Sequence, residues 1–384
     1  MTNDDKKLGI YVHIPFCLQK CGYCDFYSVP LAEKAWLERY VHCLIREIKK
    51  AAADFSRLPV ETIFFGGGTP NLLSPEQLRV ILEALVNSFN IEDDAEISIE
   101  ANPYRHNPGA LKLIREAGIN RISLGAQSFC DQELKILGRL HTANDVLETI
   151  ESVSEAGFDN FSLDLIYGLP GQSLQRWQDN LKMAVSRQPT HISAYLLQLS
   201  DQTPMARQVG RKEIQLLDDD TESLMYYSGI EYLSAQGFKH YELSNFAQPG
   251  YECRHNLRYW NARQYLGLGP GAVSYYDCKR VMNEPRVIDY MNNWEKGKIH
   301  PVRILETMSE KELIVDAIIL GLRLTGGINR RDFQNRFGVD IIDTYHDVIS
   351  KGIKNQLLNF TDDTLALSVK GYFLANEVLC QFIT

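Results

Sequence analysis

Strand-like runs alternate with amphipathic helical segments through the first half of the chain, and this alternation limits the possible folds most strongly. β-Branched and aromatic residues dominate six runs, at residues 8–14, 60–68, 95–102, 119–128, 158–168 and 191–199. Helical patterns lie between several of these runs, at residues 74–89, 142–157 and 173–187. Strands that alternate with helices in this way form parallel sheets. The pattern therefore predicts an α/β fold around a parallel sheet.

Polar and glycine-rich residues gather where the strand-like runs end. The segments concerned are GGGTP (66–70), EANP (100–103), GAQS (125–128) and DLIYGLP (164–170). Parallel sheets and α/β barrels place their functional sites at the carboxyl ends of the strands. We therefore expect one site assembled from several strand ends.

The pattern changes after about residue 200, and three parts are expected. Residues 1–236 would form the barrel-like part, residues 237–300 an aromatic and glycine-rich extension, and residues 301–384 a small helical or winged-helix-like domain with a hairpin at 358–368. Some winged helices bind DNA. The net charge of −9 argues against nucleic acid as a partner, because nucleic-acid-binding surfaces are basic.

Three of the eight cysteines lie close together in the segment IPFCLQKCGYCDFYS, at Cys17, Cys21 and Cys24. No run approaches the roughly 20 apolar residues that a membrane span needs, and the N-terminal residues lack the apolar core of a secretion signal. We therefore expect a cytoplasmic protein. In that reducing compartment, clustered cysteines are more often metal-binding or catalytic than disulfide-bonded.

Thiolates are suited to iron–sulfur clusters and to zinc. A structural zinc site commonly takes a second cysteine or histidine pair, and the sequence holds no second CxxC motif. A [4Fe–4S] cluster held by three cysteines leaves one iron open to another ligand. The spacing CxxxCxxC after a strand-like run therefore indicates such a cluster.

CxxxCxxC, with Tyr23 before the last cysteine, and GGGTP at 66–70 together resemble the radical S-adenosylmethionine (SAM) superfamily. Within it, the segments YVHIPFC, FFGGGTP, IEANP, ISLGAQSF, LGRLH and DLIYGLPGQ are similar to the oxygen-independent coproporphyrinogen III oxidase family, over roughly residues 8–270. The resemblance implies a partial TIM-like (β/α) barrel of the radical SAM type. It also implies a [4Fe–4S] cluster on Cys17, Cys21 and Cys24, with SAM on the open iron.

The resemblance further implies which residues bind SAM. The glycines Gly66, Gly67 and Gly68, with Thr69, would let the backbone approach the methionine part of SAM, and Glu100 would accept hydrogen bonds from its ribose. Taken singly, Arg139 and Asp164 fit a structural ion pair better. The complete implied set is Tyr11, Tyr23, Gly67, Gly68, Thr69, Glu100, Gln127, Arg139 and Asp164.

One position departs from the oxidase pattern. The oxidases of this family carry a fourth cysteine two positions after the last cluster ligand, and this chain has Phe26 there. The cluster does not need that cysteine, but turnover of coproporphyrinogen is put in doubt by its loss. The CDF sequence instead resembles a sister branch of haem chaperones, the HemW-like proteins.

That branch carries the signature HNxxYW, which appears here as HNLRYW at residues 255–260. Imidazole is the commonest axial ligand of haem, and tryptophan and tyrosine offer flat faces to a macrocycle. Alone, the motif fits a packed segment with a hydrogen-bonded histidine equally well. With the resemblance it indicates a haem site, with Cys253 as a second candidate ligand; the residues of the motif itself are His255, Asn256, Tyr259 and Trp260.

Three functions follow from these observations. The favoured one is a haem chaperone that binds haem and transfers it, using the cluster and SAM. The alternative is radical decarboxylation of coproporphyrinogen III, and a weaker third is radical chemistry on another substrate, so that enzyme activity stays open and no catalytic residue is assigned. The chaperone would need a haem-acceptor protein and an electron donor. A respiratory or membrane-associated acceptor would bring the chain peripherally to the inner face of the membrane.

Overall fold

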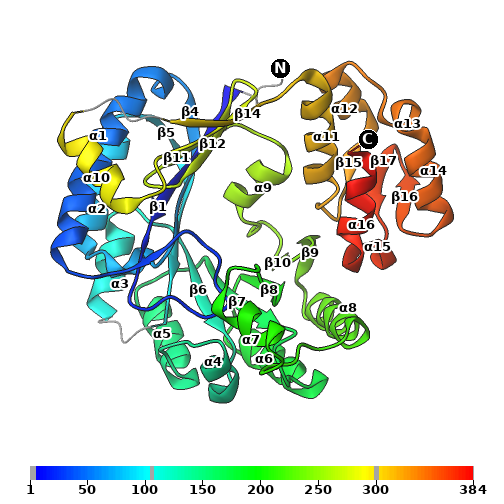
Figure 1. Cartoon of the computed structure of the whole chain (residues 1–384), viewed down its shortest axis with the longest axis horizontal. Coiled ribbons are helices and arrows are strands. Elements are labelled where there is room, and N and C mark those ends of the chain that lie inside the picture. The colour runs from blue at the N-terminus through cyan, green and yellow to red at the C-terminus, as the bar shows by residue number, and fades with distance from the viewer. Residues whose placement is uncertain (1–5, 104–107, 298–301, 384) are drawn as a thin grey trace.

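A sheet of twelve strands curves around a hollow in the computed structural model, which describes residues 6–103, 108–297 and 302–383 (Figure 1). Six parallel strands form its centre, side by side in chain order. All six coincide with the runs predicted from the sequence. They are β1 (Leu8–Ile14), β4 (Pro59–Gly67), β5 (Asn90–Ala101), β6 (Arg121–Gln127), β7 (Phe161–Tyr167) and β8 (His191–Leu196).

Amphipathic helices cover the outer face of this sheet (Figure 1). Their apolar sides meet fully buried strand residues such as Ile10, Ile63 and Leu163. The helix predicted at 74–89 begins with the expected capping box between Ser74 and Gln77. The covering helices are α1 (Ala35–Phe55), α2 (Pro75–Val86), α3 (Pro108–Glu116), α5 (Ala143–Glu155) and α6 (Leu174–Ser186).

Residues 239–282 and 303–307 extend the sheet at both edges. At one edge, β10 (Asn245–Ala247) pairs antiparallel with β8 and with β9 (Lys239–Glu242). At the other edge, β11 (Tyr265–Leu268) pairs parallel with β1. The outermost strands there are β12 (Val273–Tyr276), β13 (Lys279–Met282) and β14 (Arg303–Thr307), all antiparallel.

A short helix, α9 (Arg254–Trp260), connects β10 to β11 and lies inside the hollow of the sheet (Figure 1). The sequence predicted little helix in this region. A helix of seven residues is shorter than the window in which helical periodicity becomes visible, so its pattern was missed.

The C-terminal residues form a small domain with its own apolar core, which includes Ile318, Phe333 and Leu365. Its strands β15 (Ile328–Asn329), β17 (Thr364–Leu367) and β16 (Leu358–Thr361) pair in that order, so the predicted hairpin at 358–368 is present. The helices that pack with them are α11 (Glu310–Gly321), α12 (Arg330–Phe337), α13 (Ile341–Thr344), α14 (His346–Lys354), α15 (Val369–Phe373) and α16 (Ala375–Leu379).

This arrangement agrees with the expected helical or winged-helix-like domain. The division at residues 236 and 300 stays a prediction, and its second boundary lies outside the described residues. None of the helices in the described ranges combines the length and the apolar character that crossing a membrane requires.

Candidate functional site

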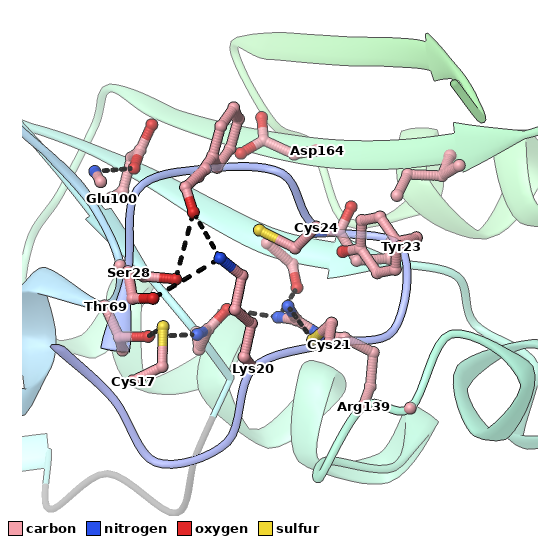
Figure 2. Close-up of a pocket in the computed structure, with 18 of the residues that line it drawn as sticks. Cys17, Lys20, Cys21, Tyr23, Cys24, Ser28, Thr69, Glu100, Arg139 and Asp164 are labelled. Carbon is pink, nitrogen blue, oxygen red and sulfur yellow. Dashed lines mark hydrogen bonds between the residues drawn. The ribbon is translucent and has the colours of Figure 1, made fainter. Parts of the chain in front are cut away.

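The three clustered cysteines lie in the loop that follows β1 (Figure 2). A short parallel pairing of β2 (Phe16–Cys17) with β3 (Val29–Pro30) closes the base of this loop. Cys17, Cys21 and Cys24 are free thiols, each half-buried. All three line one cavity of about 300 Å³ at the carboxyl ends of the strands, which we call the cluster cavity.

The thiols are not arranged for a single metal ion. Among the described residues, no three histidine, cysteine or acidic side chains converge closely enough to hold one. A [4Fe–4S] cluster does not need that convergence, because each thiolate ligates a different iron. The donor set of three thiols around a cavity therefore fits a cluster better than a zinc ion.

Two polar side chains contact the thiols. The Nη1 group of Arg139 lies 3.7 Å from Cys21 Sγ, and Thr69 Oγ1 lies 3.6 Å from Cys17 Sγ. Asn102 joins these two residues, because its Oδ1 accepts from Arg139 and its Nδ2 donates to Thr69 Oγ1 at 2.9 Å. Hydrogen bonds of this kind orient the sulfur atoms of metal ligands.

The glycine-rich turn after β4 packs directly against the base of the cysteine loop. Gly67 has a φ of +113°, and a Cβ there would lie 2.5 Å from the His13 ring. A Cβ on Gly68 would lie 2.5 Å from the carbonyl oxygen of Phe16. The glycines are thus required for packing within the chain itself, in addition to the expected approach to SAM.

Two half-buried carboxylates line the cluster cavity (Figure 2). Glu100 accepts a hydrogen bond from the backbone N–H of Gly67 at 3.0 Å. Burial, and then the nearby charge of Asp164, raise the pKa of Glu100 to about 7. Asp164 accepts hydrogen bonds from three serine hydroxyls, those of Ser123, Ser162 and Ser193. Burial raises the pKa of Asp164 despite these hydrogen bonds.

The structure brings most of the implied SAM-binding residues to the cluster cavity. Tyr11 is the exception: it lies deeper in the hollow, where its hydroxyl donates to His13 Nδ1 at 3.0 Å, while His13 Nε2 donates to the Tyr27 carbonyl. The residues that line the cluster cavity are Tyr23, Gly67, Gly68, Thr69, Glu100, Gln127, Arg139 and Asp164.

Phe26, which replaces the fourth cysteine of the oxidases, lies on the wall of the cluster cavity and is 62% exposed. Its carbonyl oxygen accepts a hydrogen bond from Lys20 Nζ at 2.9 Å. The side chain therefore contributes an apolar surface where a cysteine would contribute a thiol.

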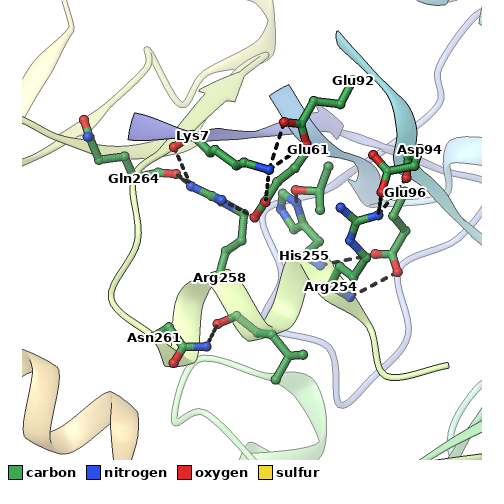
Figure 3. A network of polar contacts seen from close by, with 12 residues as sticks. Lys7, Glu61, Glu92, Asp94, Glu96, Arg254, His255, Arg258, Asn261 and Gln264 are labelled. Atoms are coloured by element: carbon green, nitrogen blue, oxygen red, sulfur yellow. Dashed lines mark hydrogen bonds and ion pairs between the residues drawn. The ribbon is translucent and has the colours of Figure 1, made fainter. Parts of the chain in front are cut away.

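The HNLRYW motif forms α9, which polar contacts join to β4 and β5 (Figure 3). Glu96 on β5 accepts hydrogen bonds from the backbone N–H groups of Arg254 and His255, at 3.1 and 3.2 Å. Arg258 is buried and pairs with Glu61 on β4. These contacts hold α9 against the amino-terminal half of β4 and the middle of β5.

His255 is buried, with both ring nitrogens hydrogen-bonded. Nδ1 is 2.8 Å from Thr62 Oγ1, and Nε2 is 2.8 Å from the Tyr259 hydroxyl. The ring stacks on Phe64 with the centroids 5.2 Å apart. Burial, followed by the charges of Arg258 and Arg121, lowers the pKa of His255 to about 3. In this conformation His255 is thus the packed histidine that the motif alone allowed for, and its role as a haem ligand stays a prediction.

The other motif residues face different spaces. Asn256 and Tyr259 line a cavity of about 190 Å³ in the hollow, which we call the inner cavity. Tyr259 and Trp260 line a separate groove of about 380 Å³ between the sheet and α11, which we call the aromatic groove. Cys253, the second candidate ligand, is buried with its thiol 3.6 Å from Glu96.

Asn102 and Glu96 are among the site residues that the sequence analysis missed. Asn102 had a usable signal, since it follows Glu100 in EANP at a strand end. Glu96 had none, because the helix that it holds lies 158 residues further along the chain.

Two family models match the chain. The model of the radical SAM superfamily matches residues 11–184, which include the cysteine loop, the glycine-rich turn, Glu100 and Asp164. The model of the HemN C-terminal domain matches residues 308–374. Fold and site thus define a protein of the radical SAM class.

The solved structure of coproporphyrinogen III oxidase (HemN) from Escherichia coli has a TM-score of 0.85, over 98% of this chain and 90% of that chain. Its sequence identity is 23%, so that the likeness concerns the fold alone. The heme chaperone HemW of Bacillus subtilis is 34% identical over 375 residues, 97% of this chain and 98% of that protein. The heme chaperone HemW of Escherichia coli is 39% identical over 265 residues, 69% of each chain. The chain belongs to the HemW family.

Proposed function

We propose that this protein is a haem chaperone, which binds haem and passes it to an acceptor protein. The observation that carries the proposal is the similarity to heme chaperone HemW of Bacillus subtilis over nearly the whole of both chains. Phe26 supports it, since a phenylalanine stands where the oxidases carry a cysteine. The acceptor and an electron donor for the cluster are proposed as protein partners, and an acceptor at the membrane would make the contact there peripheral.

The cluster cavity fits a [4Fe–4S] cluster with SAM. Cys17, Cys21 and Cys24 would hold the cluster, because they are the thiols on its wall. When bound and reduced, the cluster and SAM supply a 5′-deoxyadenosyl radical. The residues that would hold SAM are those of the implied set that line the cavity, of which Glu100 offers its carboxylate to the ribose and Gly67 to Thr69 offer backbone to the methionine.

His255 is the proposed axial ligand of haem. Ligation through Nε2 requires the proton to be on Nδ1, where Thr62 Oγ1 lies close enough to accept it. Trp260 and Tyr259 would offer their ring faces to the macrocycle, and Asn256 would contact it from the preceding turn. The chain would thus bind haem at α9, whose residues do not line the cluster cavity.

One anaerobic experiment tests the function. The cluster is reconstituted, and haem titration and decarboxylation of coproporphyrinogen are measured on the same sample. We expect saturable haem binding that weakens in His255→Ala, with no protoporphyrinogen formed. Decarboxylation without stoichiometric haem binding would overturn the chaperone proposal in favour of the oxidase. The oxidase is kept as the alternative because the fold is that of HemN and the implied SAM-binding residues line the cluster cavity.

The ligand assignment has its own test. Cys21→Ser should lose iron and the broad visible absorption of the cluster, whereas Cys278→Ser, an exposed cysteine far along the chain, should keep both. Full iron content in Cys21→Ser would refute the assignment.

A further inference from the structure

His255 presents no accessible nitrogen in this conformation. Nε2 faces the hydroxyl of Tyr259, and Nδ1 faces Thr62. An iron atom that binds Nε2 must therefore take the position of the Tyr259 hydroxyl. The route by which haem reaches His255 is thus decided by what lies on the other side of Tyr259.

The aromatic groove lies on that side. Tyr11 and Tyr259 line both the inner cavity and the aromatic groove, whereas His255 lines the inner cavity alone. The ring of Tyr259 also meets Tyr265 of the groove edge-to-face, at 4.6 Å between centroids. Tyr259 is thus part of the partition between the groove and the histidine.

Two of the other cavities, the inner cavity and the cluster cavity, suit a macrocycle poorly. The inner cavity measures about 190 Å³, below the roughly 300–1,000 Å³ usual for organic ligands. Charged side chains surround it, namely Glu100, Arg121 and Asp164. The cluster cavity is already assigned to SAM.

A further cavity of about 460 Å³, lined by Trp260, Arg263 and Arg336, has a suitable size but is lined by neither Tyr259 nor His255. The aromatic groove, at about 380 Å³, falls within the usual range.

The walls of the groove suit a flat ligand with acidic groups. Four aromatic side chains line it from α9 and from the strands beyond, and stacked or edge contacts with such rings favour a planar π-system. Arg263 and Arg280 also lie on the wall, together with Asp316, with which Arg280 pairs. Guanidinium groups are the side chains that most readily recognise carboxylates such as the propionates of haem. The four aromatic residues are Tyr259, Trp260, Tyr265 and Tyr275, and Tyr11 of β1 is a fifth aromatic residue on the wall.

The C-terminal domain completes the groove. Leu320 on α11 lines it from that domain. The guanidinium of Arg323 lies 4.6 Å from the centre of the Trp260 ring, which fixes the indole at the junction. The groove therefore exists only where the barrel and the C-terminal domain meet.

We propose that haem docks in the aromatic groove, and that the side chain of Tyr259 is a gate that must swing away before His255 Nε2 can bind the iron. The inference rests on the proposed function, because it takes haem as the ligand and His255 as its axial partner. No bond within the protein is broken except the hydrogen bond between Tyr259 and His255.

The experiment is a haem titration of the full chain with its cluster reconstituted, followed through the Soret band. Val273→Trp fills the groove from β12, and Leu320→Trp fills it from the opposite wall, so that one variant remains if the other misfolds. Both should weaken haem binding at least about tenfold while iron content and SAM binding persist. The control is Val369→Trp, at a position that is 60% exposed on the C-terminal domain.

The gate has a separate variant. Tyr259→Phe keeps the ring but removes the hydroxyl that occupies Nε2, so haem should bind about fivefold more tightly, the equivalent of one typical hydrogen bond. Weaker binding in Tyr259→Phe would overturn the gate, since the phenol would then be supporting the iron.

The outcomes separate this inference from the proposed function. If His255→Ala loses haem while both groove variants keep the affinity of the unchanged protein, haem reaches His255 by another route and the groove is refuted, although the chaperone stands. If the unchanged protein binds no haem, both are refuted.

Discussion

At the scale of single residues, Asn102 connects two of the three thiols. Its amide joins Arg139, which contacts Cys21, to Thr69, which contacts Cys17. Asn102 thus acts on the sulfur atoms through Arg139 and Thr69. The geometry therefore makes Asn102 a positioning residue, which keeps two hydrogen-bond donors directed at the sulfur atoms.

Asn102→Ala should release both donors and leave the three cysteines intact. We expect a chelator to remove iron about tenfold faster than from the unchanged protein, which is the lower end of effects seen when groups behind metal ligands are lost. The control is Asn87→Ala, an exposed position at the end of α2. An unchanged rate of iron loss would show that the thiols need no such support.

At the scale of elements, α9 depends on contacts from distant strands. The carboxylate of Glu96 accepts from the first two backbone N–H groups of the helix, of which that of His255 is buried with it and that of Arg254 is partly buried. A helix of one or two turns does not form by itself in water. The strand β5 thus supplies what the short sequence of α9 cannot.

Glu96→Ala should leave those N–H groups without an acceptor and lower the free energy of unfolding by about 3 kcal/mol. Asp94→Ala is the matched control, because Asp94 is a highly exposed partner of Arg254, 3.5 Å away, two residues earlier on the same strand. Exposed pairs contribute about 1 kcal/mol or less. Urea unfolding measures both, and equal losses in the two variants would contradict the capping role.

Glu47 on α1 is another buried carboxylate. It holds the residues that follow β11 and β13. Glu47 accepts from the Gly269 N–H, from Asn283 and from the Tyr290 hydroxyl. Burial nevertheless raises its pKa from 4.5 to about 7. The folded protein therefore keeps this proton to a higher pH than the unfolded chain does.

Stability from Glu47 is consequently present below pH 4.5 and declines as the pH rises to about 7. The loss is on the order of 3 kcal/mol. Glu47→Gln removes this titration, so the difference in free energy of unfolding between the unchanged protein and the variant should fall across that range. Glu38→Gln, an exposed position on the same helix, is the control. A pH-independent difference would show that Glu47 ionises normally.

At the scale of the whole molecule, the cysteine loop lies beyond the carboxyl end of β1, whereas α9 is held by residues nearer the start of the strands. The cavities beside them are neighbours, because Glu100, Ser123, Asp164 and Tyr195 line both the cluster cavity and the inner cavity.

The residues that hold α9 in place, which we call its tethers, are Glu61, Thr62 and Glu96. None of them lines the cluster cavity. We therefore expect Cys21→Ser, without its cluster, to bind haem as tightly as the cluster-free unchanged protein. Titration of both samples measures this, and loss of haem binding in the variant alone would show that the cysteine loop and α9 are coupled.

The features that depend on neighbouring residues could be predicted from the sequence. The six central strands, the cap of α2 and the hairpin at 358–368 follow from patterns within a few residues, and so does the cysteine spacing. Eight of the nine implied SAM residues reach one cavity because parallel strands end at one edge.

The rest depends on contacts between distant segments. β11 joins β1 across some 250 residues, and nothing in either strand specifies that partner. The hydrogen bond between His255 and Thr62, 193 residues apart, decides that the histidine is enclosed. Tyr11 lies on β1, which leads into the cysteine loop. It is the central residue of that strand, and it therefore lies beside the HNLRYW motif and not at the cluster cavity.

The separation of the cysteine loop from the tethers of α9 has a consequence for repair of the cluster. Iron–sulfur clusters that are open to substrate are exposed to oxygen, and the half-buried thiols of the cysteine loop line an open cavity. Oxidative loss of iron there would leave the tethers of α9 untouched, since Glu61 and Glu96 do not line that cavity. On the function proposed above, a damaged molecule would keep the fold around His255, and rebuilding one metal centre would restore it without synthesis of a new chain.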